Sequence, residues 1–256
     1  MKVYACQYEN IPANVKICEF QAQSGVNEYH FTVCPNRYAD VETQSRWLAQ
    51  AYHKTMDSLG LNGNSVILRR FFCSDLSNQT ASLAKAEFSS SHDNAEPCAF
   101  SWICQPPQPP AKIALWAYHI KDPAGRLDKK SDGSVLILKR AEINHHFTTA
   151  LTCPDHVSSY EQSRYLLDKY NNSLTGENLC LKDNLIRTWF FVQNIDMNYH
   201  GLVTARREFF AEHGLRPETH FVASTGVEGT NTDINSIVTM DAWSIWPVRP
   251  EQITYL

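Results

Sequence analysis

The sequence predicts an α+β protein built from two diverged copies of one domain in tandem. The first observation is a repeated series of His-Phe-Thr, Cys-Pro and Gln-Ser-Arg, which occurs near residue 30 and again near residue 146. The second observation is that strand-like segments follow each series in the same order. Within a copy, strand-like and helix-like stretches succeed one another, which is typical of a sheet covered by helices. We expect the order β-β-α-β-α-β-β in each copy.

Four segments match between the copies in one order, as expected for an internal repeat. Within the third of them, Arg69 and Arg187 fall at matching places on the two middle strands. The matching pairs are His30 with His146, Gln44 with Gln162, segment 65–76 with segment 184–195, and strand 113–120 with strand 238–245.

The first elements of the second copy are two strands and a helix. Residues 135–153 contain two apolar runs rich in β-branched residues, which favour strands. From Ser158 the apolar residues recur at steps of three and four, which is the period of a helical face. Ser158 or Ser159 caps this helix, and Glu161 lies in its first turn, where the helix dipole favours a carboxylate.

The later elements of the second copy are a strand, a helix and two closing strands. Residues 184–192 alternate in polarity as a strand does. A second helix is expected over 199–213, because Gly214 follows it as glycine commonly follows a helix. The two closing strands are expected at 220–227 and 234–245, joined by a loop rich in Gly, Asn and Asp.

The boundary between the copies is expected in the segment 121–134. This segment contains Pro, two Gly, three Asp and four basic residues, so it is predicted to be a solvated linker or a polar hairpin. The predicted domains are therefore residues 1–122 and residues 133–256.

The composition excludes several classes of function. A net charge of −4 without a large basic block gives no reason to expect nucleic acid as a partner. No run approaches 18 apolar residues, and the first 20 residues lack the apolar run of a secretion signal. The eight cysteines form no CxxC pair or zinc-like cluster, so free thiols are expected. We therefore expect a cytoplasmic protein with no membrane contact, no metal site and no cofactor.

One stretch of the second copy resembles the RidA/YjgF family, the reactive intermediate deaminases also called L-PSP endoribonuclease-like proteins. In 185–214, Phe191 and Val192 end a strand, and Phe209 and Phe210 form an aromatic pair before a short loop, as in that family. The resemblance implies chorismate-mutase-like domains and a homo-oligomer with threefold or pseudo-threefold packing, for which the aromatic-rich strands around Phe71 and Trp189 offer interface residues. A weaker likeness connects the chain to chorismatases, hydrolases that contain similar domains.

The sequence departs from the family pattern at two places. Family deaminases carry an arginine at the start of the penultimate strand that holds the substrate carboxylate, and Thr219 occupies that place here, while segment 96–99 of the first copy also lacks it. The family acid on the last strand is matched by Asp241, whereas Trp116 takes its place in the first copy. The first domain is therefore predicted to be degenerate, and the second to carry the ligand site.

Two acids are the candidate catalytic residues. Asp241 lies in an apolar strand, where a carboxylate is costly unless it is paired or used. Glu228 lies near glycines that permit close approach of a ligand. Each also has an explanation without catalysis: Asp241 as a strand-end residue facing solvent, and Glu228 as part of a polar hairpin. The candidate ligand-binding residues are Thr219, His220, Ser224, Thr225 and Arg187, although His220 also fits a structural role and Arg187 a subunit interface.

Three functions remain open from the sequence. The first is a hydrolase or deaminase-like enzyme for a small carboxylated or cyclic metabolite, in which Asp241 and Glu228 act as general acid or base on water. It is not expected to be a standard imine deaminase, because the family arginine is absent. The second is a non-catalytic protein that binds or senses a small ligand. The third is a scaffold whose duplicated domains assemble.

Overall fold

The computed structural model divides the chain into two compact units, Met1–Leu127 and Asp128–Leu256. It describes residues 1–83, 92–93, 96–125, 127–155, 157–216, 218–233 and 235–248. The end of the predicted second domain, 249–256, lies outside the described residues. In the part of the chain that is described, no helix has the length and apolar character needed to cross a membrane.

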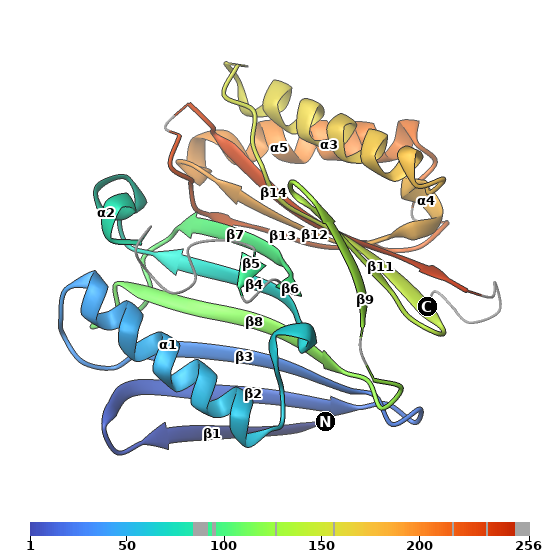
Figure 1. The fold of residues 1–256 in the computed structure, drawn as a ribbon. Helices are drawn as coiled ribbons and strands as arrows, with labels where there is room; N and C mark the ends of the chain where they lie inside the picture. The colour runs from blue at the N-terminus through green and yellow to red at the C-terminus, as the bar shows by residue number, and fades with distance from the viewer. Residues whose placement is uncertain are drawn as a thin grey trace. The chain divides into compact units, whose positions relative to one another are not determined.

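Unit 1 is a six-stranded sheet with the strand order β1-β2-β3-β8-β4-β7, and α1 crosses one of its faces (Figure 1). All pairs are antiparallel except β4 with β7. A small hairpin of β5 and β6 is separate from this sheet. The elements are β1 (Lys2–Tyr8), β2 (Ile11–Gln21), β3 (Asn27–Pro35), α1 (Val41–Ser58), η1 (Gly63–Ser65), β4 (Val66–Cys73), α2 (Leu76–Leu83), β5 (His92–Asp93), β6 (Glu96–Pro97), β7 (Ala99–Cys104) and β8 (Ile113–Lys121).

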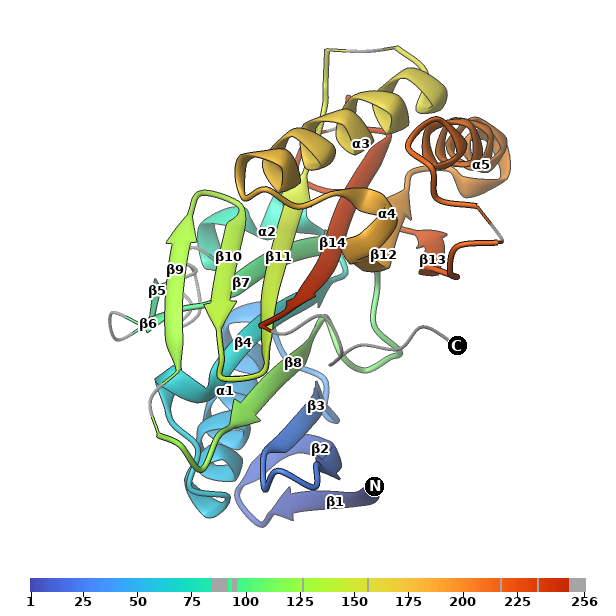
Figure 2. The same ribbon diagram turned by 90° about the vertical axis from the view of Figure 1, so that its right-hand side faces the viewer.

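Unit 2 repeats this path with its own six-stranded sheet, in the order β9-β10-β11-β14-β12-β13. Helices α3 and α5 lie side by side over one face of that sheet (Figure 2). Two six-stranded sheets with helices on one face confirm the predicted α+β class. The elements are β9 (Asp128–Asp132), β10 (Val135–Lys139), β11 (Ile143–Leu151), α3 (Ser159–Gly176), α4 (Leu181–Asn184), β12 (Leu185–Val192), α5 (Ile195–Glu212), β13 (Ala223–Glu228) and β14 (Val238–Pro247).

The helices cover the sheets because their apolar residues recur on one side. Helix α3 buries Leu166 and Tyr170 against the strands of unit 2, together with Met240 and Phe190. It begins after Ser158, whose side chain accepts a hydrogen bond from the backbone N–H of Glu161, as the sequence predicted.

Each six-stranded sheet has one more strand than the predicted order, and unit 1 adds the separate hairpin of β5 and β6. The edge strand β9 has the sequence DKKSD and pairs with β10, so part of the segment expected to be a solvated linker or a polar hairpin forms one strand of a hairpin. A hydrophobic pattern cannot reveal such a strand, because it contains no apolar residue. In unit 1 the corresponding edge strand is β1, which pairs with β2.

The His-Phe-Thr match between the copies is wrong by one residue. In unit 1, Tyr29 is paired with His119, whose Nε2 lies 2.8 Å from the hydroxyl of Tyr52 on α1. In unit 2, His146 is paired with Ser244, whose hydroxyl bonds that of Tyr170 on α3. His146 is therefore the counterpart of Tyr29, and a shift of one residue reverses the faces that a strand presents.

The predicted match of Arg69 with Arg187 is wrong for the same reason. Arg69 is paired with Ala117, whereas Thr188 is paired with Ala242, the residue that corresponds to Ala117 in the aligned last strands. Arg69 therefore corresponds to Thr188 on the helix side of the sheet, and Arg187 lies on the opposite side.

Candidate functional site

Asp241 is held by a distortion in the neighbouring strand. The pairing of β11 with β14 shifts between Thr148 and Leu151, which leaves a bulge opposite Asp241. Ala150 in this bulge has a φ of 55°, and its backbone N–H donates to Asp241 Oδ1 at 2.7 Å. Asp241 is 1% exposed. One oxygen of this carboxylate therefore satisfies a backbone group that the bulge removes from the ladder.

Glu228 caps a helix and is exposed to solvent. Its Oε1 accepts from the N–H of Asn194 at 3.1 Å, and its Oε2 accepts from the N–H of Ile195 at 2.7 Å. Asn194 precedes α5 with a φ of 48° and makes no side-chain cap of its own. Glu228 thus supplies the carboxylate that the helix N-terminus favours. This accounts for Glu228 without catalysis.

Ser224 lies on the helix side of β13. Its Oγ accepts from Thr188 Oγ1 at 2.9 Å and from Arg206 Nη1, on α5, at 2.6 Å. Thr225 is the next residue and points to the opposite face, because side chains alternate along a strand. The two neighbours therefore cannot serve one site on a single face of the sheet.

Thr219 and His220 lie in the loop before β13, which begins only at Ala223. Thr219 closes a local turn, accepting from the N–H of Arg216 and donating to its carbonyl. His220 is buried, and its Nε2 donates to the carbonyl of Leu185 at 3.0 Å. The placement of Thr219 at the start of the penultimate strand is therefore wrong, and Ala223 occupies that position.

Arg187, Thr225 and Asp241 share the face of the unit 2 sheet opposite the helices. Arg187 Nη2 donates to Thr225 Oγ1 at 2.8 Å, and the guanidinium lies over the ring of Trp189 at 5.0 Å. Trp189 is paired directly with Asp241. Three neighbouring strands therefore bring together a held guanidinium, an aromatic surface and a buried carboxylate. Arg187, Thr225 and Asp241 were marked as candidates by the sequence, and Trp189 was not.

His145 extends this face and was not among the predicted site residues. Its ring stacks with Phe147 and Trp243, and its Nδ1 accepts from Trp243 Nε1 at 3.2 Å. Burial and, to a lesser extent, the nearby charge of Arg140 lower the pKa of His145 to about 3. His145 is therefore neutral at physiological pH and acts as an acceptor.

Unit 1 carries a different set at the corresponding positions. The ring of Trp116 stacks with His30, and the guanidinium of Arg70 lies over it at 5.2 Å. Burial lowers the pKa of His30, although Glu28 opposes this shift. An aromatic ring thus stands in unit 1 where the acid stands in unit 2.

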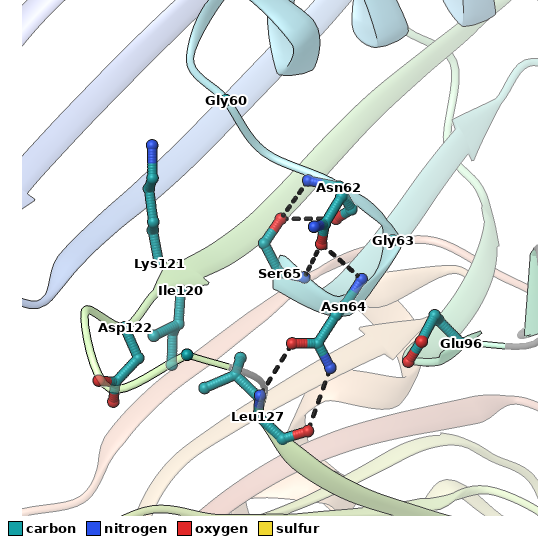
Figure 3. A pocket seen from close by; sticks show the side chains of 11 residues that line it. Gly60, Asn62, Gly63, Asn64, Ser65, Glu96, Ile120, Lys121, Asp122 and Leu127 are labelled. Carbon is teal, nitrogen blue, oxygen red and sulfur yellow. Dashed lines mark hydrogen bonds between the residues drawn. The ribbon is translucent and has the colours of Figure 1, made fainter.

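A cleft of about 500 Å³ lies in unit 1 at residues that the sequence did not mark (Figure 3). Asn64 holds Leu127 there through two hydrogen bonds, one from its Nδ2 at 3.1 Å and one to its Oδ1 at 2.8 Å. Lys121 borders the cleft, but its ammonium donates to the carbonyl of Leu59. These bonds hold the middle of the segment 121–134 onto unit 1.

Among known proteins, similarity to this chain was found only in solved structures. No family model matches the chain, and no curated protein matches its sequence. A chorismatase matches with a TM-score of 0.42 and 13% identity over 71% of this chain and 49% of its own, so the chain spans about half of that protein.

Two bacterial structures match about half of this chain each. A YjgF family member from Neisseria meningitidis matches with a TM-score of 0.36 and 10% identity, over 49% of this chain and 89% of its own. A member of the same family from Mycobacterium tuberculosis matches with a TM-score of 0.30 and 16% identity, over 45% of this chain and 82% of its own. These structures come from the groups that the sequence resembles.

The described residues contain no cluster of three or more His, Cys, Asp or Glu side chains arranged to hold a metal ion. His145 and His146 cannot form such a site together, because they are adjacent on β11 and point to opposite faces.

Proposed function

We propose that the chain binds a small carboxylated molecule on the face of the unit 2 sheet opposite the helices, with Arg187 as the residue that holds the carboxylate. The observation that carries this proposal is the guanidinium of Arg187, which is held by Thr225 and stacked over Trp189. A planar guanidinium that is already oriented loses little freedom when it binds a carboxylate. It therefore supplies the function of the arginine that is missing from the start of β13.

Hydrolytic or deaminase-type catalysis is the second candidate function. It is favoured by Asp241, a buried carboxylate on the same face whose orientation is set by the N–H of Ala150. An oriented acid in a buried site can position water for attack on a bound molecule. We place binding ahead of catalysis, because Glu228 caps α5. Of the two acids proposed as catalytic residues, only Asp241 is then available for the reaction.

The binding proposal is tested by isothermal titration of the full chain with pyruvate, benzoate and the cyclic dicarboxylate chorismate. We expect Arg187→Met to weaken the tightest of these by about tenfold to a hundredfold, since a charge-assisted contact contributes roughly 1.5–3 kcal/mol. Arg206→Met is the matched control, because Arg206 bonds Ser224 on the helix side. Equal binding by wild type and Arg187→Met would refute the assignment.

Catalysis is tested with 2-aminoacrylate generated in solution. We expect slow turnover by the wild type, since Thr219 and Ala223 offer no guanidinium at the family position. If Asp241 acts on water, Asp241→Asn removes the remaining turnover while carboxylate binding persists. Fast turnover would show that the chain is an efficient imine deaminase, contrary to our expectation. Slow turnover that Asp241→Asn does not change would leave binding as the proposed function.

We also propose that the chain assembles through threefold or pseudo-threefold packing. The family resemblance supports this proposal, but Phe71 does not. Phe71 is 1% exposed and packs against Phe100 and Trp102 inside unit 1, so its predicted role as an interface residue is wrong. Trp189 is only partly buried and remains the candidate.

A further inference from the structure

A second pocket lies on the helix side of the unit 2 sheet, at its β9 edge. Its volume is about 120 Å³. Strands β9 and β11 and the end of helix α3 supply its charged and polar side chains, and β10, which lies between those strands, supplies its apolar wall. The lining residues are Lys130, Asp132, Val135, Ile137, His146, Ser173 and Glu177.

The floor of this pocket is a histidine with both ring nitrogens in hydrogen-bonding distance of hydroxyls. His146 Nε2 lies 3.1 Å from Ser173 Oγ, and its Nδ1 lies 3.3 Å from Thr148 Oγ1. His146 is fully buried, and burial lowers its pKa to about 4. The floor is therefore a neutral, hydrogen-bonded surface, and the charges of the pocket are those of its rim.

The rim carries one cation and two anions. Lys130 and Asp132 are two residues apart on β9, so they point to the same face, with backbones about 7 Å apart. Glu177 follows α3 one turn after Ser173. All three rim residues are exposed, and among the described residues no ion pair joins Lys130 to Asp132 or Glu177. Opposite charges therefore stand at the rim without neutralising one another through direct contact.

The positions of the two rim acids are occupied by other residue types in unit 1. Across the sheet, the row Lys130–Ile137–His146 of unit 2 corresponds to Lys2–Glu19–Tyr29 of unit 1. The next row has Asp132, Val135 and Thr148 in unit 2 and Tyr4, Ile17 and Phe31 in unit 1.

The helix above these rows changes in the same sense. Thr55 and the cap residue Leu59 of unit 1 correspond to Ser173 and the cap residue Glu177 of unit 2. In unit 1 the space is filled, since Tyr8 reaches under α1 and its hydroxyl bonds Thr55 Oγ1 at 2.8 Å. Unit 1 thus places Tyr4 and Leu59 where unit 2 places the two rim acids, Asp132 and Glu177.

We propose that this pocket binds a small zwitterion, with its acid group at Lys130, its ammonium group at Asp132 and Glu177, and its short body against Ile137 and the His146–Ser173 floor. A volume of about 120 Å³ equals roughly four waters at 30 Å³ each, which admits a ligand of only a few heavy atoms. The spacing along β9 suits a ligand that carries both charges within a few ångströms.

The proposal does not rest on the proposed function, because Arg187 lies on the other face of the sheet. Isothermal titration or ligand-observed NMR of the full chain with glycine, β-alanine and taurine tests it. We expect millimolar or tighter binding of at least one of the three, and weaker binding of acetate and methylammonium, which carry a single charge. Arg187→Met should leave this binding unchanged.

Substitutions at the rim separate a pocket from a solvated surface. Lys130→Met and Asp132→Asn should each weaken the binding at least about tenfold, the equivalent of 1.4 kcal/mol. Lys182→Met is the matched control, since Lys182 is an exposed lysine of α4 outside the pocket. The double change Asp132→Tyr and Glu177→Leu introduces the unit 1 residues in place of both rim acids and should abolish zwitterion binding while circular dichroism stays unchanged.

Three results would overturn the proposal. One is no detectable binding of any of the three zwitterions to the folded wild type. Another is binding of acetate or methylammonium as tight as that of the zwitterions. The third is zwitterion binding that survives both Lys130→Met and Asp132→Asn.

Discussion

At the scale of single residues, the hydrogen bond from the backbone N–H of Ala150 explains why a carboxylate is present at Asp241. The N–H of Ala150, which the bulge takes out of the strand ladder, donates to Asp241 Oδ1. Asp241→Ala should therefore lower the free energy of unfolding by about 1.5–3 kcal/mol, because a hydrogen bond to a charged group is lost. Asp241→Asn should cost roughly half as much, since a neutral acceptor remains. Urea denaturation measures both, and equal costs would contradict the charge-assisted bond.

A substitution at Ala150 should change stability in the opposite direction to a substitution at Asp241. Its φ of 55° lies in the left-handed region, which costs a residue with a Cβ roughly 1–2 kcal/mol. Ala150→Gly should therefore raise the melting temperature of the protein or leave it unchanged, while Asp241 keeps its bond. A marked loss of stability would show that the bulge is formed differently.

His145 and His146 predict the pH dependence of unit 2. Burial holds the pKa of His145 at about 3 and that of His146 at about 4, below the unfolded value of about 6.5. The unfolded chain therefore binds protons first, so the stabilisation is complete above pH 6.5 and is lost as the pH falls toward 4. Each histidine should contribute a slope of about 1.4 kcal/mol per pH unit in that window.

Hydrogen exchange of peptides from β11 between pH 8 and pH 5, corrected for intrinsic rates, measures this slope. His145→Phe keeps a ring beside Phe147 and Trp243 and removes one titrating group, so the slope should fall to about half. The variant should also lose about 1 kcal/mol at every pH, because Trp243 Nε1 loses its acceptor. A slope identical to the wild type would exclude His145 as its source.

At the scale of elements, the crossing of α3 and α5 depends on Gly201. A Cβ at this position of α5 would meet Ser159 Oγ and would lie 2.9 Å from the backbone nitrogen of Tyr160, at the start of α3. Alanine favours a helix by about 1 kcal/mol, but overpacking against backbone costs about 1–3 kcal/mol. We expect Gly201→Ala to destabilise unit 2, as measured by urea denaturation.

Gly176, at the end of α3, provides the control for this substitution. A Cβ there would meet nothing within 4 Å. Gly176→Ala should therefore be neutral or stabilising by up to about 1 kcal/mol. If the two substitutions have the same effect, helix propensity rather than the close approach of the helices decides the outcome at Gly201.

At the scale of the whole molecule, the testable property is the assembly. A threefold assembly of chains of 29.2 kDa would have three times that mass in light scattering. Trp189→Ala should shift the mass toward that of one chain if its ring lies in the interface, because aromatic residues contribute strongly to interface energy. Tyr165→Ala is the control, since Tyr165 is an exposed aromatic residue of α3. A single-chain mass for the wild type would refute the assembly.

The sequence alone determined the elements whose signals are local. The start of α3 follows from Ser158 and Glu161, which lie within one turn, and the buried side of α3 follows from the spacing of Leu166 and Tyr170. The existence of two related units follows from ordered matches that tolerate small insertions. The sequence left segment 121–134 open between a solvated linker and a polar hairpin, and it did not locate the strand β9, which pairs through its backbone and contains no apolar residue.

Only the tertiary structure decided what the candidate site residues contact. Asp241 and Ala150 are 91 residues apart, and Glu228 and Ile195 are 33 apart, so no local pattern reveals these bonds. Register decided the rest, since side chains alternate along a strand and one residue of slip exchanges the two faces of a sheet. The sequence therefore named Arg187, Thr225 and Asp241 as separate candidates. Their common face, and the opposite face of Ser224 and Glu228, arise from strand pairing across the whole of unit 2.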